Sequence, residues 1–242
     1  MANPYFRFKQ FIIHQDRCAM KVTTDACLFG AWVAREVLAR SHTIRNMLDI
    51  GTGTGLLTLM LAQKNPGLVV DAIEIDKATY EQAKENIAAS PFKNKIYLEH
   101  GDILNEPYQR KYDIIISNPP FYEKELLSAS SRKNVAHHNE GLLLEDLLPV
   151  IKNRLLAASR FYLLLPYKRK KEIDDLLKKN SLYFTKIVSV RQSVNHDHFR
   201  LMIEGALYND HHAEETDIAI KDENDQYTPG FIKLLNEYYL YL

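Results

Sequence analysis

The stretch Asp49-Ile50-Gly51-Thr52-Gly53-Thr54-Gly55 decides the fold of this 242-residue chain. It follows a short apolar strand predicted over 46–50 and precedes an apolar-faced helix predicted over 56–64. Glycines at such a junction allow a tight turn and let a ligand approach the backbone closely. The third glycine stands one place earlier than in a dinucleotide fingerprint, G-x-G-x-x-G. The loop therefore favours a ligand without a pyrophosphate, and a plain glycine-rich turn is the alternative.

An acidic residue follows at the distance that a nucleoside site requires. Glu74 ends the next apolar run and lies nineteen residues beyond Gly55. A carboxylate at this place can accept hydrogen bonds from both hydroxyls of a ribose. The glycine loop and Glu74 together predict a nucleoside-binding site, whereas a solvent-facing acid is the alternative.

Strand and helix signals alternate around this loop. Strands are predicted over 46–50, 68–75, 95–100, 112–117 and 159–165, and helices over 25–40, 56–64, 77–89, 142–157 and 168–179. Such alternation predicts an α/β fold with a mostly parallel, doubly wound sheet that helices cover on both faces. Two further strands, over 183–190 and 199–207, are predicted to pair as an antiparallel hairpin at one sheet edge.

The chain reads as one domain with three parts. Residues 1–44 form an N-terminal extension that includes a helix with Thr24 as its N-cap. Residues 45–209 form the core with the candidate site. Residues 210–242 are predicted to be an acidic loop followed by a terminal helix over 228–239.

Composition excludes several classes of protein. Hydrophobic residues make up 46% and charged residues 26%, which is ordinary for a globular domain and excludes disordered or collagen-like chains. No apolar run approaches the roughly 20 residues of a membrane helix. Cys18 and Cys27 show no ligand or redox spacing, so we expect free thiols and a cytoplasmic protein.

The charge pattern permits a nucleic-acid surface. The net charge is zero, but residues 210–225 contain seven acids and one lysine, so the rest of the chain carries a net charge of plus six. Basic residues cluster near the N-terminus and over 168–171. A nucleic-acid surface is one interpretation, and ordinary solvated faces are the other.

A second loop indicates the chemistry. The apolar strand 112–117 runs into Asn118-Pro119-Pro120-Phe121, which in a doubly wound sheet faces the same crevice as the glycine loop. Asn118 and Pro119 offer carbonyl acceptors, and two prolines hold the turn stiff. Phe121 offers a face for stacking. Two acceptors beside an aromatic face suit an NH₂ group, while a proline-rich surface turn is the alternative.

These motifs resemble those of class I S-adenosylmethionine-dependent methyltransferases that act on amine or amide nitrogens. The N-terminal stretches 6–11 and 18–26, the Gly30-Ala31-Trp32 triplet and the C-terminal Tyr227-Thr228-Pro229 narrow the resemblance. They are similar to the bacterial family that methylates N6 of adenine-37 in the anticodon loop of valine tRNA. The resemblance spans nearly the whole chain and implies a Rossmann-like class I methyltransferase fold, with S-adenosylmethionine as cofactor and tRNA as partner.

The resemblance also implies roles for individual residues. The catalytic set is Asn118, Pro119, Pro120 and Phe121. The cofactor-binding set is Lys21, Thr24, Asp25, Asp49, Gly51, Gly53, Gly55, Glu74, Ile75 and Asp102. Glu74 would hold the ribose, Ile75 would pack on the adenine, and Asp102 would accept from its amine.

The RNA-binding set comes from two polar segments. Residues 123–139, next to the catalytic set, are predicted to form a mobile lid over the substrate. The predicted RNA contacts are Arg132, Lys133, His137, His138, Lys168 and Arg169. No metal is expected, because the histidines lack cysteines at ligand spacing and methyl transfer by in-line displacement does not require one.

Other functions use closely similar motifs. The target could instead be guanine N2 in ribosomal RNA or a glutamine amide in a protein. The chain could also be an inactive protein that binds the cofactor or RNA, although such a protein would not need Asn118 and Phe121. A dehydrogenase is a third alternative, against which the early third glycine speaks.

Overall fold

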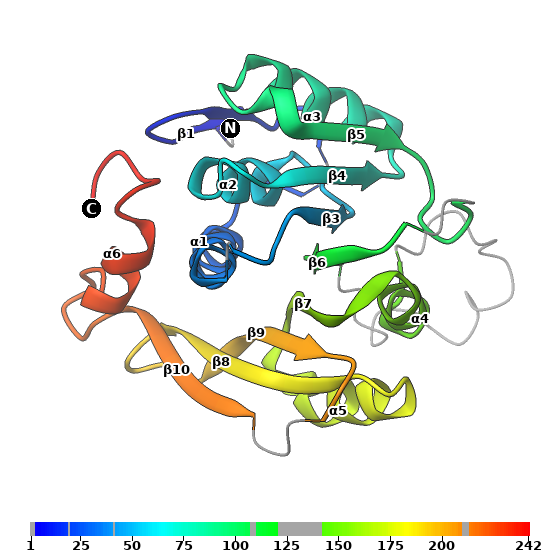
Figure 1. Ribbon diagram of the computed structural model, residues 1–242. Coiled ribbons are helices and arrows are strands. Elements are labelled where there is room, and N and C mark those ends of the chain that lie inside the picture. The colour runs from blue at the N-terminus through cyan, green and yellow to red at the C-terminus, as the bar shows by residue number, and fades with distance from the viewer. Residues whose placement is uncertain (1–2, 19, 41, 107–109, 121–141, 210–212) are drawn as a thin grey trace, which may run out of the picture.

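The computed structural model describes residues 3–18, 20–40, 42–106, 110–120, 142–209 and 213–242 (Figure 1). Its centre is an eight-stranded sheet with strand order β10-β8-β9-β7-β6-β3-β4-β5. The strands are β3 (Asn46–Ile50), β4 (Val69–Glu74), β5 (Ile96–His100), β6 (Tyr112–Ser117), β7 (Leu155–Pro166), β8 (Tyr183–Ser193), β9 (His198–Ala206) and β10 (Glu214–Lys221). Only β9 runs antiparallel to its two neighbours, so the mostly parallel sheet is confirmed.

Helices cover both faces of the sheet. One layer holds α1 (Thr24–Ala39), α2 (Leu56–Lys64), α3 (Lys77–Ala89) and α6 (Pro229–Leu235), and the other holds α4 (Leu144–Arg154) and α5 (Lys170–Lys179) (Figure 1). The central strands are buried on both faces: Ile114 and Ile116 join the core under the first layer, and Ile115 joins the core under the second. This two-sided burial explains why β6 is a continuous apolar run.

Local signals set the helix boundaries. The predicted bounds of α2 and α3 are confirmed, and Asp76 caps α3 by accepting from the Thr79 amide at 2.8 Å. The predicted cap of α1 is wrong by one residue. Thr23 has an extended backbone and accepts from the Ala26 amide, while Thr24 is the first helical residue. The predicted helix 142–157 is shorter, because β7 begins directly after Arg154.

The acidic stretch is not a loop as predicted, because Glu214–Lys221 forms β10, parallel to β8. The antiparallel pair of β8 and β9 is confirmed, but β10 takes the outer edge beyond it. Acidic side chains of β10 face basic ones on neighbouring elements: Lys170–Glu215 at 2.7 Å and Arg191–Asp217 at 3.4 Å. The acidic run therefore neutralises neighbouring cations and puts charge on an edge strand, which disfavours pairing with other chains.

The N-terminal extension is part of the core. A hairpin of β1 (Tyr5–Arg7) and β2 (Ile12–His14), together with its connecting turn, adds Phe8, Phe11 and Ile13 to the core that also contains residues of α1 and α2. The C-terminal end lies against it, since the Lys9 amide donates to the Tyr238 carbonyl at 2.8 Å. The Tyr238 hydroxyl in turn donates to the Met60 carbonyl in α2 at 3.0 Å. Both chain ends are thus fastened to the helix that follows the glycine loop.

Two short 3₁₀ turns complete the described elements. η1 (Lys93–Lys95) precedes β5, and η4 (Tyr167–Arg169) follows β7. None of the helices in the described part of the chain is both long and apolar enough to span a membrane.

Candidate functional site

The predicted site residues gather where the parallel strands end. The glycine loop follows β3, Ile75 follows β4, and Asp102 follows β5. β3 and β6 are neighbours, and Ile50 stands opposite Ser117 in their register. The Ser117 hydroxyl donates to the Ile50 carbonyl at 2.8 Å and ties the two strand ends together. Asn118 therefore leaves the sheet beside the glycine loop, as the sequence predicted.

The glycine loop has a backbone that only glycine adopts easily. Gly51, Gly53 and Gly55 have φ values of 69°, 60° and 82°. A Cβ placed on Gly51 or Gly53 would meet no atom within 4 Å, so these two residues border open space. The loop thus combines an exposed, turned backbone with room for a ligand.

Asp49 lies beneath this loop and has an unsatisfied oxygen. The side chain is fully buried, and its Oδ2 accepts from the hydroxyls of Thr52 and Thr58, both at 2.7 Å. No described atom bonds Oδ1. Burial raises the pKa of Asp49 from 3.8 to about 6, although the two threonine hydroxyls act in the opposite direction. A buried acceptor without a partner indicates a ligand that brings a donor.

Glu74 organises the same loop from the next strand. Its Oε2 accepts from the Gly53 amide at 2.9 Å and its Oε1 from the Asp76 amide at 3.0 Å. Each carboxylate oxygen keeps a further lone pair, so both can accept another hydrogen bond. Ile75 beside it is 64% exposed and offers the apolar surface that a planar base needs.

Asp102 follows β5 at the same edge of the sheet. It is half-buried, and its two oxygens accept from the Leu104 amide at 3.0 Å and the Asn105 side chain at 2.8 Å. These local bonds fix the direction of the carboxylate. Its predicted contact with an adenine amine is compatible with the remaining lone pairs.

The catalytic set is described only in part. Asn118 is half-buried, Pro119 is buried and Pro120 is half-buried, while Phe121 lies outside the described residues. The Asn118 Nδ2 lies 3.9 Å from the Met20 sulfur, a weak acceptor. The N-terminal segment therefore reaches the residue that is predicted to hold the target amine.

The N-terminal cofactor residues lie at the start of α1. Lys21 is exposed, and Thr24 is half-buried. Asp25 accepts from the Arg200 Nε at 2.8 Å, and this ion pair joins α1 to β9. Its carboxylate is thus already paired. Arg200 is a neighbour of the candidate site that no pattern in the sequence indicated.

The predicted RNA contacts divide into two groups. Lys168 and Arg169 lie in η4, directly after β7. Arg169 donates to both oxygens of Glu172, at 2.9 and 2.7 Å, and this pairing raises the arginine's pKa. Their contact with RNA stays a prediction. The other four residues (Arg132, Lys133, His137 and His138) and the predicted lid lie outside the described residues.

Two polar residues of the site were missed from the sequence. Thr58 is the hydroxyl in an otherwise apolar stretch of α2, which was a usable signal for a role below the loop. Asn86 on α3 donates to the Thr54 carbonyl at 2.9 Å, and nothing in its surroundings along the chain distinguishes it from a surface residue.

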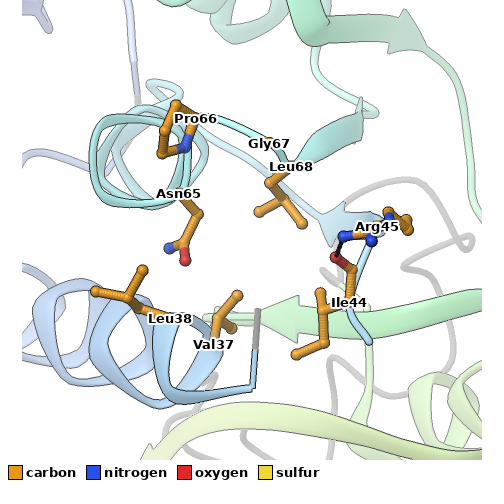
Figure 2. A pocket seen from close by; sticks show the side chains of 8 residues that line it. All are labelled: Val37, Leu38, Ile44, Arg45, Asn65, Pro66, Gly67 and Leu68. Atoms are coloured by element: carbon orange, nitrogen blue, oxygen red, sulfur yellow. Dashed lines mark hydrogen bonds between the residues drawn. The ribbon is translucent and has the colours of Figure 1, made fainter. Parts of the chain in front are cut away.

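A separate hollow lies at the other end of the parallel strands, where β3 and β4 begin. It measures about 230 Å³ and is formed by the end of α1, the segment before β3 and the turn between α2 and β4 (Figure 2). Asn65 lies at its wall and donates to the carbonyls of Ala34 and Leu61. None of the predicted site residues lines this hollow.

No group of three or more His, Cys, Asp or Glu residues is arranged to hold a metal ion in the described ranges. The polar groups at the site are instead backbone amides, which donate, carboxylates, which accept, and one amide side chain, which can do both. This set suits an organic ligand with hydroxyl and amine groups.

Comparison with known proteins places the chain in a family. Residues 30–160 match the family model of the methyltransferase small domain. The chain is 38% identical over 241 residues to the tRNA1(Val) (adenine(37)-N6)-methyltransferase of Dyadobacter fermentans, and the match covers 98% of each chain.

Solved structures support the same fold. A predicted O-methyltransferase of Agrobacterium tumefaciens superposes with a TM-score of 0.66 at 16% identity, covering 88% of this chain and 96% of that one. The glycopeptide N-methyltransferase MtfA, solved with S-adenosyl-L-methionine, superposes with a TM-score of 0.53 at 12% identity, covering 74% and 94%. By the full-length match to the Dyadobacter protein, the chain belongs to the family of tRNA1(Val) (adenine(37)-N6)-methyltransferases.

Proposed function

We propose that this protein transfers a methyl group from S-adenosylmethionine to N6 of adenine-37 in valine tRNA. The observation that carries the proposal is the adjacency of two loops on neighbouring strands. The glycine loop after β3 borders open space, and Asn118 leaves β6 directly beside it. Family membership supports the choice of tRNA and of the adenine amine.

The residues present fit this cofactor. Gly51 and Gly53 leave room for it. The Oδ1 of Asp49 has no described partner and can accept a hydrogen bond from a donor such as an amino group. Glu74 has free lone pairs for the ribose hydroxyls, and Ile75 offers an apolar surface for the adenine. When bound, S-adenosylmethionine supplies an electrophilic methyl group on a positively charged sulfur.

Asn118 and Pro119 would hold the target amine. Their carbonyl oxygens accept its two N–H bonds, which keeps the nitrogen lone pair directed at the methyl group. The transfer would exchange the carbon–sulfur bond of the methyl group for a carbon–nitrogen bond. The electron pair of the broken bond would stay on the sulfur of S-adenosylhomocysteine, and one proton of N6 would pass to water. Alignment of nitrogen, carbon and sulfur is the main requirement, so rigid loops favour the reaction. The adenine must first leave its stack in the anticodon loop.

The test compares the wild-type protein with Asn118→Ala. Wild-type protein with S-adenosylmethionine should methylate valine tRNA, and digestion followed by mass analysis should find N6-methyladenine at position 37. Asn118→Ala should reduce kcat by roughly two to three powers of ten, the usual loss for one preorganised polar contact. Its affinity for S-adenosylhomocysteine should match wild type.

Other outcomes would reject the proposal. Label from the cofactor found on guanine or on protein would assign another substrate. Absence of label on total RNA and total protein, with intact cofactor binding, would favour an inactive binding protein. Loss of cofactor affinity alone in Asn118→Ala would remove the role assigned to this residue.

A further inference from the structure

Three buried amide side chains hold the N-terminal segment against α3 and the glycine loop. We call Gln15, Gln82 and Asn86 the amide clasp. Gln15 is 5% exposed, and the other two are each 1% exposed. Buried amides are costly unless they are hydrogen-bonded, so their partners show what they stabilise.

Asn86 joins two distant parts of the chain. Its Oδ1 accepts from the His14 amide and its Nδ2 donates to the His14 carbonyl, both at 2.9 Å, as a neighbouring strand would. The same Nδ2 donates to the Thr54 carbonyl at 2.9 Å. Both N–H groups of the side chain are therefore used, one on β2 and one on the glycine loop.

The glutamines fix the segment that follows β2. Gln15 donates to the Asn3 carbonyl at 2.9 Å and accepts from the Val22 amide at 2.8 Å, which turns the chain back towards the site. In the orientation that satisfies its amide, Gln82 donates to Asp16 at 2.9 Å and accepts from the Arg17 guanidinium at 3.2 Å. The amide clasp thus fixes the path of the segment between β2 and α1.

This segment also approaches Asn118. Met20 lies next to the clasped residues, and its sulfur is 3.9 Å from the Asn118 Nδ2. The glycine loop lies on the other side of Asn86 and contains three glycines in left-handed conformations. Glycines lose more conformational entropy than other residues when they are ordered, so a bond that fixes this loop beforehand lowers the cost of binding a ligand.

We propose that Asn86 is a positioning residue for cofactor binding. It holds the Thr54 carbonyl and β2 in one arrangement, so that the glycine loop and the N-terminal segment form a single preordered cofactor site. The inference deepens the proposed function and rests on it for the identity of the cofactor. Asn86 itself touches neither the cofactor nor the substrate in this role.

The test measures binding and turnover of Asn86→Ala separately. Isothermal titration with S-adenosylhomocysteine should give a Kd about tenfold higher than wild type, the order expected from loss of buried hydrogen bonds. The KM for S-adenosylmethionine should rise similarly, while kcat at saturating cofactor should stay within about twofold. Hydrogen exchange without ligand should be faster at the amides of Gly53 and Gly55.

The chain offers a matched control. Glu85 lies on the same helix and pairs with Arg17 of the same segment, but on the exposed surface. Glu85→Ala should leave the Kd unchanged, because exposed ion pairs contribute little. If Asn86→Ala lowers the melting temperature but binds S-adenosylhomocysteine like wild type, the residue is only structural and the inference is overturned.

Two further measurements keep the inference decidable. If Asn86→Ala fails to fold, Gln15→Ala serves as the test instead. This variant removes the acceptor for the Val22 amide without touching the glycine loop, and it should raise the Kd for S-adenosylhomocysteine. An unchanged Kd in Gln15→Ala would then overturn the inference. Wild-type protein that binds S-adenosylhomocysteine but methylates no tRNA would reject the proposed function alone, since the Kd values still decide the role of the clasp.

Discussion

Asp49 and Glu204 are both buried carboxylates of the central sheet, but they differ in how their oxygens are bonded. Glu204 is 1% exposed and receives two bonds from Arg40, at 2.9 and 3.1 Å. Hydroxyls of Tyr162 and Thr185 donate to it at 2.9 and 2.6 Å. Asp49 receives only two hydroxyl bonds, both on one oxygen, and the other oxygen has no described partner.

The difference distinguishes the structural carboxylate of Glu204 from that of Asp49, which we propose to bind a ligand. Burial alone would raise the pKa of Glu204, but the bonds and charge of its partners outweigh burial and lower it. Burial prevails at Asp49 and raises its pKa to about 6. Fully paired charge therefore marks the part of the sheet that holds the fold together, whereas incompletely paired charge marks the end of the strands where we propose that the cofactor binds.

The largest expected effect is on stability at the structural carboxylate. Glu204→Ala leaves the Arg40 guanidinium, the buried Tyr162 hydroxyl and the half-buried Thr185 hydroxyl without their acceptor. Breaking such a buried pair costs about 3–5 kcal/mol of the free energy of unfolding. Urea unfolding followed by circular dichroism would measure it, and cofactor affinity of the folded fraction should be unchanged. A loss below about 1 kcal/mol would contradict the comparison.

The reverse pattern is expected at Asp49. Asp49→Asn keeps the shape but removes a buried charge, so the free energy of unfolding should stay equal or increase. Affinity for S-adenosylhomocysteine should fall by about 1.5–3 kcal/mol, the value of a hydrogen bond to a charged group. Titration calorimetry and urea unfolding on the same sample would separate the two effects. If the variant loses stability but keeps its affinity for S-adenosylhomocysteine, Asp49 is a structural carboxylate like Glu204.

The two carboxylates should also respond to pH with opposite signs. The folded-state pKa of Asp49 is raised, so its contribution to stability decreases as pH rises from about 4 to 6. The folded-state pKa of Glu204 is lowered from 4.5, so its contribution is present above that value and is lost as pH falls below it. Below pH 6, protonation of Asp49 should weaken cofactor affinity by up to about tenfold per pH unit. A pH-independent affinity in Asp49→Asn would support this, and an identical pH profile in both proteins would contradict it.

The smallest effect is expected at the surface beyond β7. The double variant Lys168→Ala, Lys171→Ala tests the positive charge of this surface and leaves the pairs of Arg169 and Lys170 with glutamates in place. If this surface contacts RNA, the slope of the logarithm of tRNA affinity against the logarithm of salt concentration should decrease in magnitude by about 0.7 for each lost phosphate contact. Filter binding at several salt concentrations would measure it. An unchanged slope would assign these lysines to ordinary solvated surface.

The sequence predicted correctly those parts of the molecule where the backbone conformation or the burial allows only a few residue types. The glycines of the loop, the continuous apolar run of β6 and the prolines after Asn118 each have few alternatives, and the structure has them where they were expected. The strand β10 was missed because most of its residues are acidic or polar. Only Ile218 and Ile220 show the spacing of two residues that is typical of one face of a strand. Their cationic partners lie on other elements, so no local pattern reveals the pairing.

The clasp and the N-terminal hairpin were missed for a related reason. Asn86 looks like a surface residue of an amphipathic helix until β2 and the glycine loop are placed beside it. Contacts between residues far apart in the chain decide its burial, and a single sequence does not contain that information. The helix bounds depended on local signals and were therefore predictable within a few residues.

In the proposed site, the register that pairs Ile50 with Ser117 sets the distance between the methyl donor and the methyl acceptor. A slip of one residue between β3 and β6 would shift Asn118 by about 3.3 Å and turn its side chain to the other face. No adjustment of a loop could recover that alignment.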